Sequence, residues 1–458
     1  MEARWCHNGR RTNIACDTVP PMVRLLARLL VPVLVALTLR ASPAGATPPD
    51  VFGFGGRTQG MGMTGVSFTD DYEAVYSNPA GLSRARRNGI HLGMQQGAFR
   101  LSLDGVNSPL DPYGGTTIGL QIPLPFGGVL EDTLVIGAGF FTPHGAVLQT
   151  DIIFPEIASW VLLNRTQSVH LQMGLGINLS RLLPGLRLGV GFAALANIGG
   201  RLNISIDQAN QFVSETETQL LASFSPIIGA QYDIGPVSLG FTWHDEVISD
   251  IDLNIVTSLP LELPVITITA TPQYDPHLFA AEVSYRPTSQ WLIAAQFNAR
   301  LWSRYGGVVG RTTSNSNLPP APDFRNTYSP RLGVEYNATY KRTTGSLRAG
   351  YAFEMTPAPP AGLRPGRDSQ GNVREENGEQ VLSLLRYIDN NRHVLTFGGG
   401  VDWQPTLGAH VRLETFLQYH RLTPRTHDIS NEGDGLTGAP LESAGNVIAG
   451  GWTVSLEW

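Results

Sequence analysis

The chain has 458 residues, of which 42% are apolar and only 15% are charged, and its formal net charge is −6. Soluble domains usually carry about a quarter of charged residues, so this composition argues against an ordinary cytosolic enzyme, and the acidic balance excludes a basic nucleic-acid binder. After residue 46 no apolar run reaches the roughly 18 residues that a membrane-spanning helix needs. The classes that remain are all-β.

The N-terminus has the pattern of an export signal. A basic head follows Met22, an apolar stretch covers Leu29 to Leu39, and small residues end at Ala46. These are the three parts of a secretory signal peptide, with Met22 as the expected start of translation. Cleavage after Ala46 would remove both cysteines of the chain, which leaves no disulfide or thiolate metal site. We therefore predict that residues 1–46 form a signal peptide region.

Residues 47–87 do not follow a strand pattern. Glycines are frequent in this stretch, and it ends in the series Asp70-Asp71-Tyr72 and Asn78-Pro79-Ala80-Gly81. Irregular backbone is tolerated at membrane depth only where protein encloses it. In a membrane barrel we therefore expect this stretch, which precedes the first strand, to fold up into the lumen.

From residue 88 onward apolar and polar residues alternate with period two, which predicts strands with one apolar face. Between residues 408 and 421, for example, Val411 and Leu413 lie on one face and Arg412 and Glu414 on the other. The fourteen predicted strands are residues 89–103, 114–124, 132–143, 167–180, 185–197, 218–233, 235–246, 276–286, 289–302, 327–341, 345–356, 392–403, 408–421 and 446–458.

The connections between these strands differ by parity. Links after even strands are short, such as Pro287-Thr288, whereas links after odd strands are longer, up to the stretch from Thr356 to Asn391. Short turns on one side and long loops on the other are typical of an outer-membrane barrel, with the turns in the periplasm. A soluble β-sandwich would alternate as well, but its loops would not segregate by parity.

The last strand ends with an aromatic residue, Trp458, and resembles the C-terminal signal that outer-membrane barrels present to their assembly machinery. Aromatic residues also fall near other strand ends, where an interfacial girdle needs amphipathic rings. These residues are Trp243, Tyr285, Trp302, Tyr340 and Trp403.

The series from Asp70 to Gly81 resembles the N-terminal hatch of the FadL-type outer-membrane transporters of long-chain fatty acids and other hydrophobic compounds. Residues Phe141 to Gly145, at the end of the third strand, look like the Pro-x-Gly element that this family carries there. The resemblance implies a 14-stranded antiparallel transmembrane β-barrel over residues 88–458, with a luminal hatch over residues 47–87.

By the same resemblance, outer loops capture an apolar ligand, which enters the lumen and leaves sideways beside a kinked third strand. Glycine and proline are where bulges or lost ladder bonds cost least. The predicted ligand-binding residues are Phe140, Phe141, Ile153, Phe154, Ile157, Trp160 and Leu163. The predicted hatch and gate residues are Asn78, Pro79, Ala80, Gly137, Gly139, Pro143 and Gly145, with Asn78 to Ala80 expected to meet the third strand.

Two of these interpretations have alternatives. Both faces of the third strand are apolar, so its inner face either contacts a ligand or packs on the hatch. The apolar loop from Val147 to Asn164 either captures an oily ligand or packs on itself.

Motifs of enzyme chemistry are absent from the sequence: there is no Gly-x-Ser-x-Gly, no Gly-rich phosphate loop and no His-Glu-x-x-His. We therefore expect no enzyme, no cofactor and no bound metal. Inward polar residues instead predict an ion-pair network in the lumen. These residues are Arg187, Glu282, Gln296, Arg300, Arg331, Glu335, Arg348, Glu354, Arg412 and Glu414.

Two functions remain from different classes. The first is uptake of small hydrophobic molecules, such as fatty acids or aromatic hydrocarbons, across the bacterial outer membrane. The second is a structural or secretion-linked barrel that holds a partner protein. The expected partners of the first are a hydrophobic ligand, outer-membrane lipid, and the barrel assembly machinery through the C-terminal strand, with no nucleic acid.

Overall fold

The computed structural model describes the chain from residue 48 to residue 458 with several gaps. The described residues are 48–108, 110, 112–144, 159–160, 169–206, 212–257, 266–307, 309–312, 318, 320–385, 387–405, 408–427 and 440–458. The predicted signal peptide region therefore lies outside the described residues.

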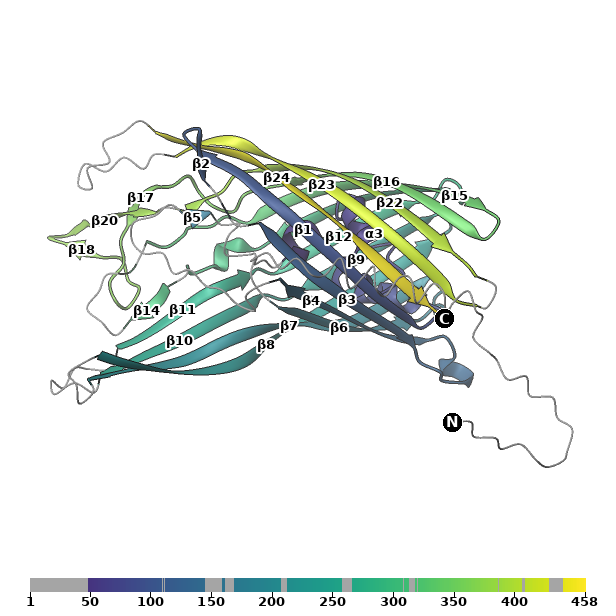
Figure 1. The fold of residues 1–458 in the computed structure, drawn as a ribbon, viewed down its shortest axis with the longest axis horizontal. Helices are drawn as coiled ribbons and strands as arrows, with labels where there is room; N and C mark the ends of the chain where they lie inside the picture. Colours follow the sequence, from purple (N-terminus) through teal and green to yellow (C-terminus); the bar gives the residue numbers. More distant parts are fainter. Residues whose placement is uncertain are drawn as a thin grey trace, which may run out of the picture. The chain divides into compact units, whose positions relative to one another are not determined.

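Fourteen strands form a closed antiparallel barrel (Figure 1). In ring order they are β1 (Gly89–Leu103), β3 (Tyr113–Pro123), β4 (Leu134–Pro143), β6 (His170–Asn178), β7 (Leu186–Ile206), β8 (Phe212–Ile234), β9 (Val237–His244), β12 (Leu278–Tyr285), β13 (Trp291–Arg300), β15 (Thr327–Tyr340), β16 (Thr343–Glu354), β22 (Arg392–Trp403), β23 (His410–His427) and β24 (Leu441–Glu457). The ring closes because β24 pairs with β1, from Gly89 opposite Glu457 to Leu103 opposite Ser443. No free edge is left in the ring, which is what a sheet in hydrocarbon requires.

The structure confirms the predicted all-β, 14-stranded antiparallel barrel. The bounds of β1 and β22 are those expected from the alternation, and most other strands differ by a few residues at their ends. The main error concerns residues 198–217, which were expected to be a loop. Within this range residues 198–206 and 212–217 extend β7 and β8 instead, because backbone pairing continues from Leu186 opposite Tyr232 to Ile206 opposite Phe212. Pairing of this kind needs no apolar face, so alternation did not predict it.

The long connections contain further strands, which the alternation did not predict either. They are β2 (Val106–Ser108), β5 (Ser159–Trp160), β10 (Val247–Thr257), β11 (Ile266–Asp275), β14 (Val309–Thr312), β17 (Gly362–Pro365), β18 (Glu375–Glu376), β19 (Glu379–Gln380), β20 (Leu382–Leu385) and β21 (Tyr387–Ile388). Of these, β10 pairs in parallel with the outer part of β7 and antiparallel with β11. The sheet therefore continues beyond the ring at the end of the barrel that carries the long connections. We call this end of the barrel the loop end.

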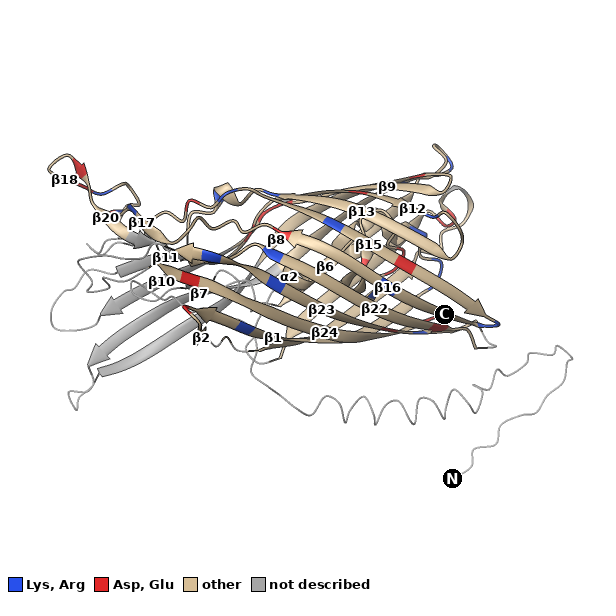
Figure 2. Cartoon of the chain, turned by 90° about the horizontal axis from the view of Figure 1, so that it is seen from above, with Lys and Arg blue, Asp and Glu red and all other residues tan. Residues whose placement is uncertain are grey.

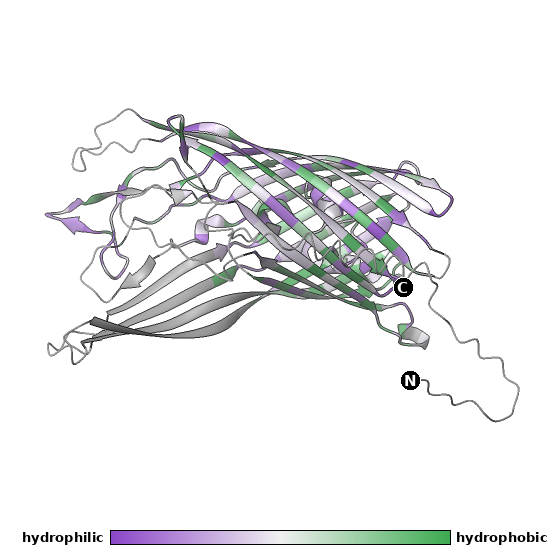
Figure 3. Cartoon of the chain, in the orientation of Figure 1, coloured by the Kyte–Doolittle hydropathy of each residue, from purple (hydrophilic) through white to green (hydrophobic). Residues whose placement is uncertain are grey.

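The outward face of the barrel is apolar. Large apolar side chains on the strands are exposed, as Ile118 and Leu120 are on β3 and Leu413 and Leu417 are on β23. Hydrophobic residues recur along the strands and charged residues are sparse on them (Figures 2 and 3). An apolar band around a closed sheet is the surface that a bilayer requires of a spanning barrel.

The aromatic residues near strand ends do not all belong to this surface. Tyr285 and Tyr340 are exposed, as the predicted girdle requires. Trp302 is not, because it lies in the helix η4 (Trp302–Arg304) with 3% of its surface exposed, packed with Tyr274 and Phe324 at the loop end. That part of the girdle prediction is wrong.

The helices are short. They are α2 (Pro48–Phe52), α3 (Gly56–Gly60), α4 (Ala74–Ser77) and the 3-10 helices η1 (Pro79–Arg84), η2 (Gly128–Leu130) and η4. In the part of the chain that the structure describes, no helix has the length and apolar character to cross a membrane.

Candidate functional site

Residues 48–87, called here the luminal segment, lie inside the ring of strands (Figure 1). Helix α3 contacts β16, β22, β23 and β24, whereas η1 contacts β4, β6, β7 and β8 on another part of the wall. Almost all side chains between Val51 and Ser83 are buried. The segment therefore fills the lumen and touches most of its circumference.

Glycines on the wall permit this close packing. The backbone nitrogen of Ala80 lies against Gly189 of β7, and that of Gly62 lies against Gly350 of β16, so closely that a Cβ atom at either wall position would overlap the segment. A strand glycine commonly marks a place where another backbone approaches. The high glycine content of the chain is thus explained in part by the packing of the segment.

Glu282 of β12 anchors the middle of the luminal segment. Its two carboxylate oxygens accept hydrogen bonds from three consecutive backbone N–H groups, those of Gly65 (2.7 Å), Val66 (3.1 Å) and Ser67 (2.9 Å). The Ser67 hydroxyl donates a fourth bond, of 2.5 Å. Bonds to an ionised acceptor are stronger than neutral ones, so this carboxylate holds the segment firmly to the wall.

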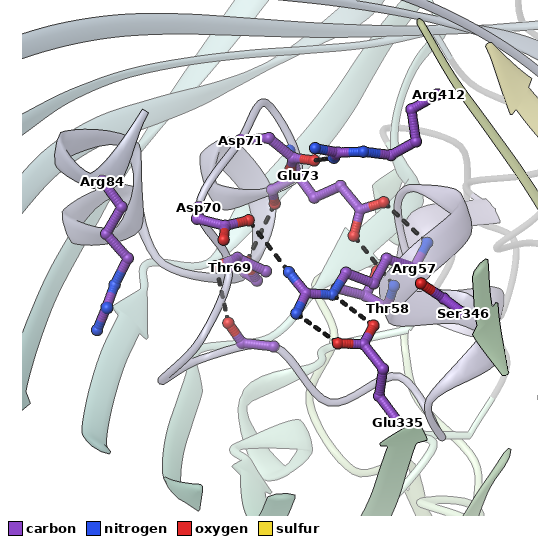
Figure 4. A network of polar contacts seen from close by, with 12 residues as sticks. Arg57, Thr58, Thr69, Asp70, Asp71, Glu73, Arg84, Glu335, Ser346 and Arg412 are labelled. Carbon is purple, nitrogen blue, oxygen red and sulfur yellow. Dashed lines mark hydrogen bonds and ion pairs between the residues drawn. The ribbon is translucent and has the colours of Figure 1, made fainter. Parts of the chain in front are cut away.

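A charged cluster joins the segment to β15 and β23 of the wall (Figure 4). The Arg57 guanidinium donates to both carboxylate oxygens of Glu335 on β15, at 2.9 and 2.8 Å, and to Asp70 at 3.1 Å. A second ion pair has its arginine on the wall and its carboxylate on the segment: Arg412 of β23 donates to Asp71 at 3.0 Å. Because Arg57 binds Glu335 through two hydrogen bonds, this contact fixes the orientation of the segment as well as its position.

Other ion pairs of the wall confirm the predicted network. Arg331 and Arg300 both contact Glu354, and Arg348 contacts Glu335 and Glu414. Beside the charged cluster, at the end of the short turns, lies a polar pocket of about 290 Å³. The wall residues that line it include Asn337, Ser346, Asp402 and Arg412.

Glu73 organises the segment itself. Its carboxylate accepts the backbone N–H groups of Arg57 and Thr58 at the start of α3, each at 3.0 Å. Burial raises the pKa of Glu73 well above its usual range, and the nearby carboxylates of Asp71 and Glu414 raise it further. Burial also raises the pKa of Asp71, against the opposing effect of Arg412.

Four neighbouring strands have a different inner face. In β1, β3, β4 and β6 the one charged residue is Arg100, which is exposed and lies on the outward face. Their inward residues are glycines, apolar side chains and neutral polar groups. We call this part of the wall the charge-free sector. Among the residues that the structure describes, the ion pairs within the ring lie on the remaining strands, so the described lumen is charged on one side and neutral on the other.

Strand β4 runs through the middle of the charge-free sector. Gly137 and Gly139 face inward and are covered by Leu82, Val75 and Phe54 of the luminal segment. This apolar cover also includes Tyr72 and Val135. Of the two alternatives for the inner face of this strand, the structure shows packing on the segment.

The two phenylalanines of β4 lie on different faces. Phe140 points outward and is half-buried, whereas Phe141 points inward, is fully buried and fills the space over Gly115. The strand pairs in unbroken register with β3 from Gly115 opposite Pro143 and with β6 from Leu134 to Phe141. The expected kink or bulge in this strand is therefore not seen in its described residues.

The tripeptide Asn78 to Ala80 was expected to meet β4, and its hydrogen bonds and close contacts with wall glycines are with β6, β7, β8 and β9. The Asn78 amide donates to the carbonyl oxygens of Ala230 on β8 (3.0 Å) and Phe241 on β9 (3.2 Å). Pro79 and Ala80 lie against glycines of β6, β7 and β8. The tripeptide thus anchors the segment to β6 and to the strands that follow it in the ring, β7, β8 and β9. Val75 precedes the tripeptide and Leu82 follows it, and these two residues cover β4.

Trp160 is the one predicted loop residue whose position is described. It is 2% exposed, and it packs in an apolar cluster with Phe52 of α2, Tyr113 of β3 and Ile388. Ser159 and Trp160 pair in parallel with Tyr387 and Ile388 of the loop after β16. The other predicted residues of this region, Gly145, Ile153, Phe154, Ile157 and Leu163, lie outside the described residues.

Sequence reasoning missed several residues of the site. Phe52, Phe54, Val75 and Leu82 were not singled out, although the Phe-Gly-Phe series is visible in the sequence. Glu282 was recognised as an inward polar residue, but its partners are backbone groups 215 or more residues away. Alternation shows which face a strand residue occupies and does not show what that residue meets across the lumen.

No protein-family model and no curated protein matches this sequence. Solved structures do match it. A FadL homologue from Pseudomonas aeruginosa has a TM-score of 0.53 at 14% identity, over 91% of this chain and 98% of that one. The P. putida toluene transporter TodX has a TM-score of 0.52 at 15% identity, over 89% of this chain and 99% of that one. The chain therefore has the fold of the FadL-type barrels, which confirms the resemblance at the level of the fold.

Proposed function

We propose that this chain is an outer-membrane channel for the uptake of small hydrophobic molecules. The observation that carries the proposal is the charge-free sector, in which four adjacent strands present a neutral inner wall covered by apolar side chains of the luminal segment. The exterior apolar band supports insertion in a bilayer. One of the structures that share this fold is a toluene transporter.

The neutral wall matters because a hydrophobic solute cannot move cheaply past ion pairs. Contact with Arg348 or Glu335 would strip water and hydrogen bonds from buried charges, which is costly unless the solute replaces them. Along β4 the solute would meet glycine and apolar side chains instead. The lumen thus offers one side along which an apolar molecule can pass.

We propose that the luminal segment is the hatch of this channel, with residues 1–46 as the signal peptide region and residues 88–458 as the barrel. Phe54, Val75 and Leu82 are proposed as the gate over Gly137 and Gly139. Their withdrawal would expose β4, and the proposed exit is sideways through the wall there. The unbroken ladder of β4 means that such an exit requires local opening of the strand.

Capture is proposed at the loop end. Trp160, Phe52 and Tyr113 form a buried apolar cluster there, which would have to open to admit a ligand, and Phe52 stacks on Tyr113 with ring centroids 4.3 Å apart. Ile153, Phe154, Ile157 and Leu163 of the same loop are proposed to extend it. From Phe52 the segment leads directly to Phe54, so capture and gate are adjacent in sequence.

The proposal is tested by uptake into liposomes that contain the purified barrel. Radiolabelled toluene and a radiolabelled long-chain fatty acid are the probes, and glucose is the polar control. We expect entry of at least one hydrophobic probe above the rate of protein-free liposomes, with glucose excluded. Identical rates with and without the barrel for both hydrophobic probes would contradict the proposal.

A further inference from the structure

Two buried polar side chains of the charge-free sector have unused hydrogen-bonding capacity. His170 and Gln172, both on β6, are 7% and 4% exposed. Among the described residues, the Nε2 atom of His170 and the Oε1 atom of Gln172 have no hydrogen-bond partner. Buried polar groups are nearly always satisfied in folded proteins, so such groups call for an explanation.

The two groups lie beside the proposed gate. Residues two apart on a strand share a face, so both side chains point into the lumen. In the ladder His170 lies opposite Phe141, and Gln172 lies opposite Gly139, the glycine that Phe54 and Val75 cover. The unused atoms are therefore next to the part of β4 that a passing ligand would contact.

The surroundings of these groups favour a neutral ligand. No inward Asp, Glu, Lys or Arg lies on β1, β3, β4 or β6 within their described residues. A carboxylate placed there would be buried without a compensating cation, which is strongly unfavourable. A hydroxyl group can instead donate its one hydrogen bond to the Gln172 oxygen and accept a second from the Nε2–H group of a neutral His170 imidazole.

We propose that His170 and Gln172 bind the hydrogen-bonding group of an uncharged, mostly apolar molecule, such as a phenol or an alcohol. The apolar part of the ligand lies against Gly137, Gly139 and Phe141 after the luminal segment has withdrawn. This inference rests on the proposed transport function and narrows its substrate class. The ligands it favours are neutral molecules with one polar group, in preference to fatty-acid anions.

The test compares three probes of similar shape, namely p-cresol, p-xylene and p-toluate, which carry a hydroxyl, a methyl and a carboxylate group. Binding to the purified full-length barrel is measured by equilibrium dialysis at neutral pH. We expect p-cresol to bind about tenfold more tightly than p-toluate. The double variant His170→Phe with Gln172→Leu should lose about tenfold in affinity for p-cresol, the effect of two ordinary hydrogen bonds, and keep that for p-xylene within about twofold.

Two further variants keep the test decisive. Gln172→Leu alone should lose part of the p-cresol affinity even if the double variant does not fold. Gln96→Leu on the exposed, outward face of β1 is the matched control and should change neither affinity.

The possible outcomes separate the two proposals. Equal binding of p-cresol and p-toluate would overturn this inference, as would an unchanged p-cresol affinity in the variants, which would mean that only water occupies these groups. In either case, retained p-xylene binding would leave the transport proposal standing. Failure of all three probes to bind would overturn this inference, and the liposome test with the long-chain fatty acid would then decide the transport proposal by itself.

Discussion

Glu282 and Ser67 are joined by two hydrogen bonds, one from the backbone N–H group and one from the hydroxyl of the serine, although they are 215 residues apart in the sequence. Glu282 belongs to strand β12 of the wall and Ser67 to the luminal segment. Together with the bonds from Gly65 and Val66, these two bonds concentrate the attachment of the segment on a single carboxylate.

The first prediction concerns this attachment. Glu282→Gln keeps the shape of the side chain but removes its charge and one acceptor, and it should weaken docking by about 2 kcal/mol, since bonds to charged groups contribute about 1.5–3 kcal/mol each. Ion conductance in planar bilayers should rise while the barrel stays folded. Glu375→Gln in the exposed strand β18 is the control and should conduct as the wild type does. Equal conductance of all three proteins would show that Glu282 does not hold the segment.

Removal of the segment itself is a second prediction. A protein that lacks residues 47–80 should still form a barrel, because the ladder from β1 to β24 does not depend on the segment. Its conductance should exceed that of the intact protein, since the buried segment no longer fills the lumen. A deleted barrel that conducts no better than the intact one would show that the segment is not a plug.

A third prediction follows from the raised pKa of Glu73. The docked segment binds the proton more tightly than the free segment does, so protonation favours docking. The effect is full below the usual pKa of about 4.5 and is lost as the pH rises through the raised pKa. Lowering the pH from neutral toward 5 should therefore reduce the conductance of the intact channel.

Glu73→Gln is the matched variant for this pH effect. It removes the titration and keeps one acceptor for the N–H groups of α3, so the slope of conductance against pH should become flatter. An unchanged slope in this variant would assign the pH dependence to other groups, of which Asp71 is the nearest candidate.

The fourth prediction concerns ligand capture at the loop end. Replacement of Phe154 and Trp160 by serine should weaken binding of toluene or a fatty acid, because each change loses on the order of 1.5–3 kcal/mol of apolar contact. Heat-modifiable migration in gel electrophoresis should be retained, since both residues fall between β4 and β6 in the sequence. Tyr340→Ser, at an exposed strand end near the short turns, is the control. Unchanged binding and uptake would favour the alternative role of holding a partner protein.

The fifth prediction concerns the last residue. The backbone of Trp458 exchanges two hydrogen bonds with Asn88, at 3.0 and 3.1 Å, next to the seam where β24 meets β1. Deletion of Trp458 should reduce assembly into the outer membrane, measured as the heat-modifiable fraction, because it also removes the terminal aromatic of the proposed assembly signal. Wild-type protein recovered as a soluble periplasmic species would contradict the membrane assignment altogether.

Much of the ring was predictable from local sequence. The alternation of apolar and polar residues predicted strand β23, in which Val411 and Leu413 oppose Arg412 and Glu414. It also indicated which charged residues face the lumen. The contacts of the luminal segment were not predictable in this way. Asn78 was expected beside β4 and instead bonds to carbonyl groups of Ala230 and Phe241, a choice made by packing across the lumen rather than by neighbouring residues.

The contacts of Asn78 to Ala80 with β6, β7, β8 and β9 determine what a mutation there would report. Ala80 is completely buried against Gly189, so Ala80→Trp would displace the segment from β7 rather than act on the exit. Val75 and Leu82, which cover Gly137, are the positions where enlarged or shortened side chains address the gate.

The uneven distribution of charge has a mechanical consequence. Separation of β15 from β16 breaks the pairs Arg331 with Glu354 and Arg348 with Glu335 in addition to the backbone ladder. In the described residues of β3, β4 and β6, no ion pair joins neighbouring strands, so only backbone bonds and van der Waals contacts hold these seams. The seams beside β4 should therefore resist separation less than the seam between β15 and β16, and they lie on the side of the wall that a hydrophobic molecule is proposed to follow.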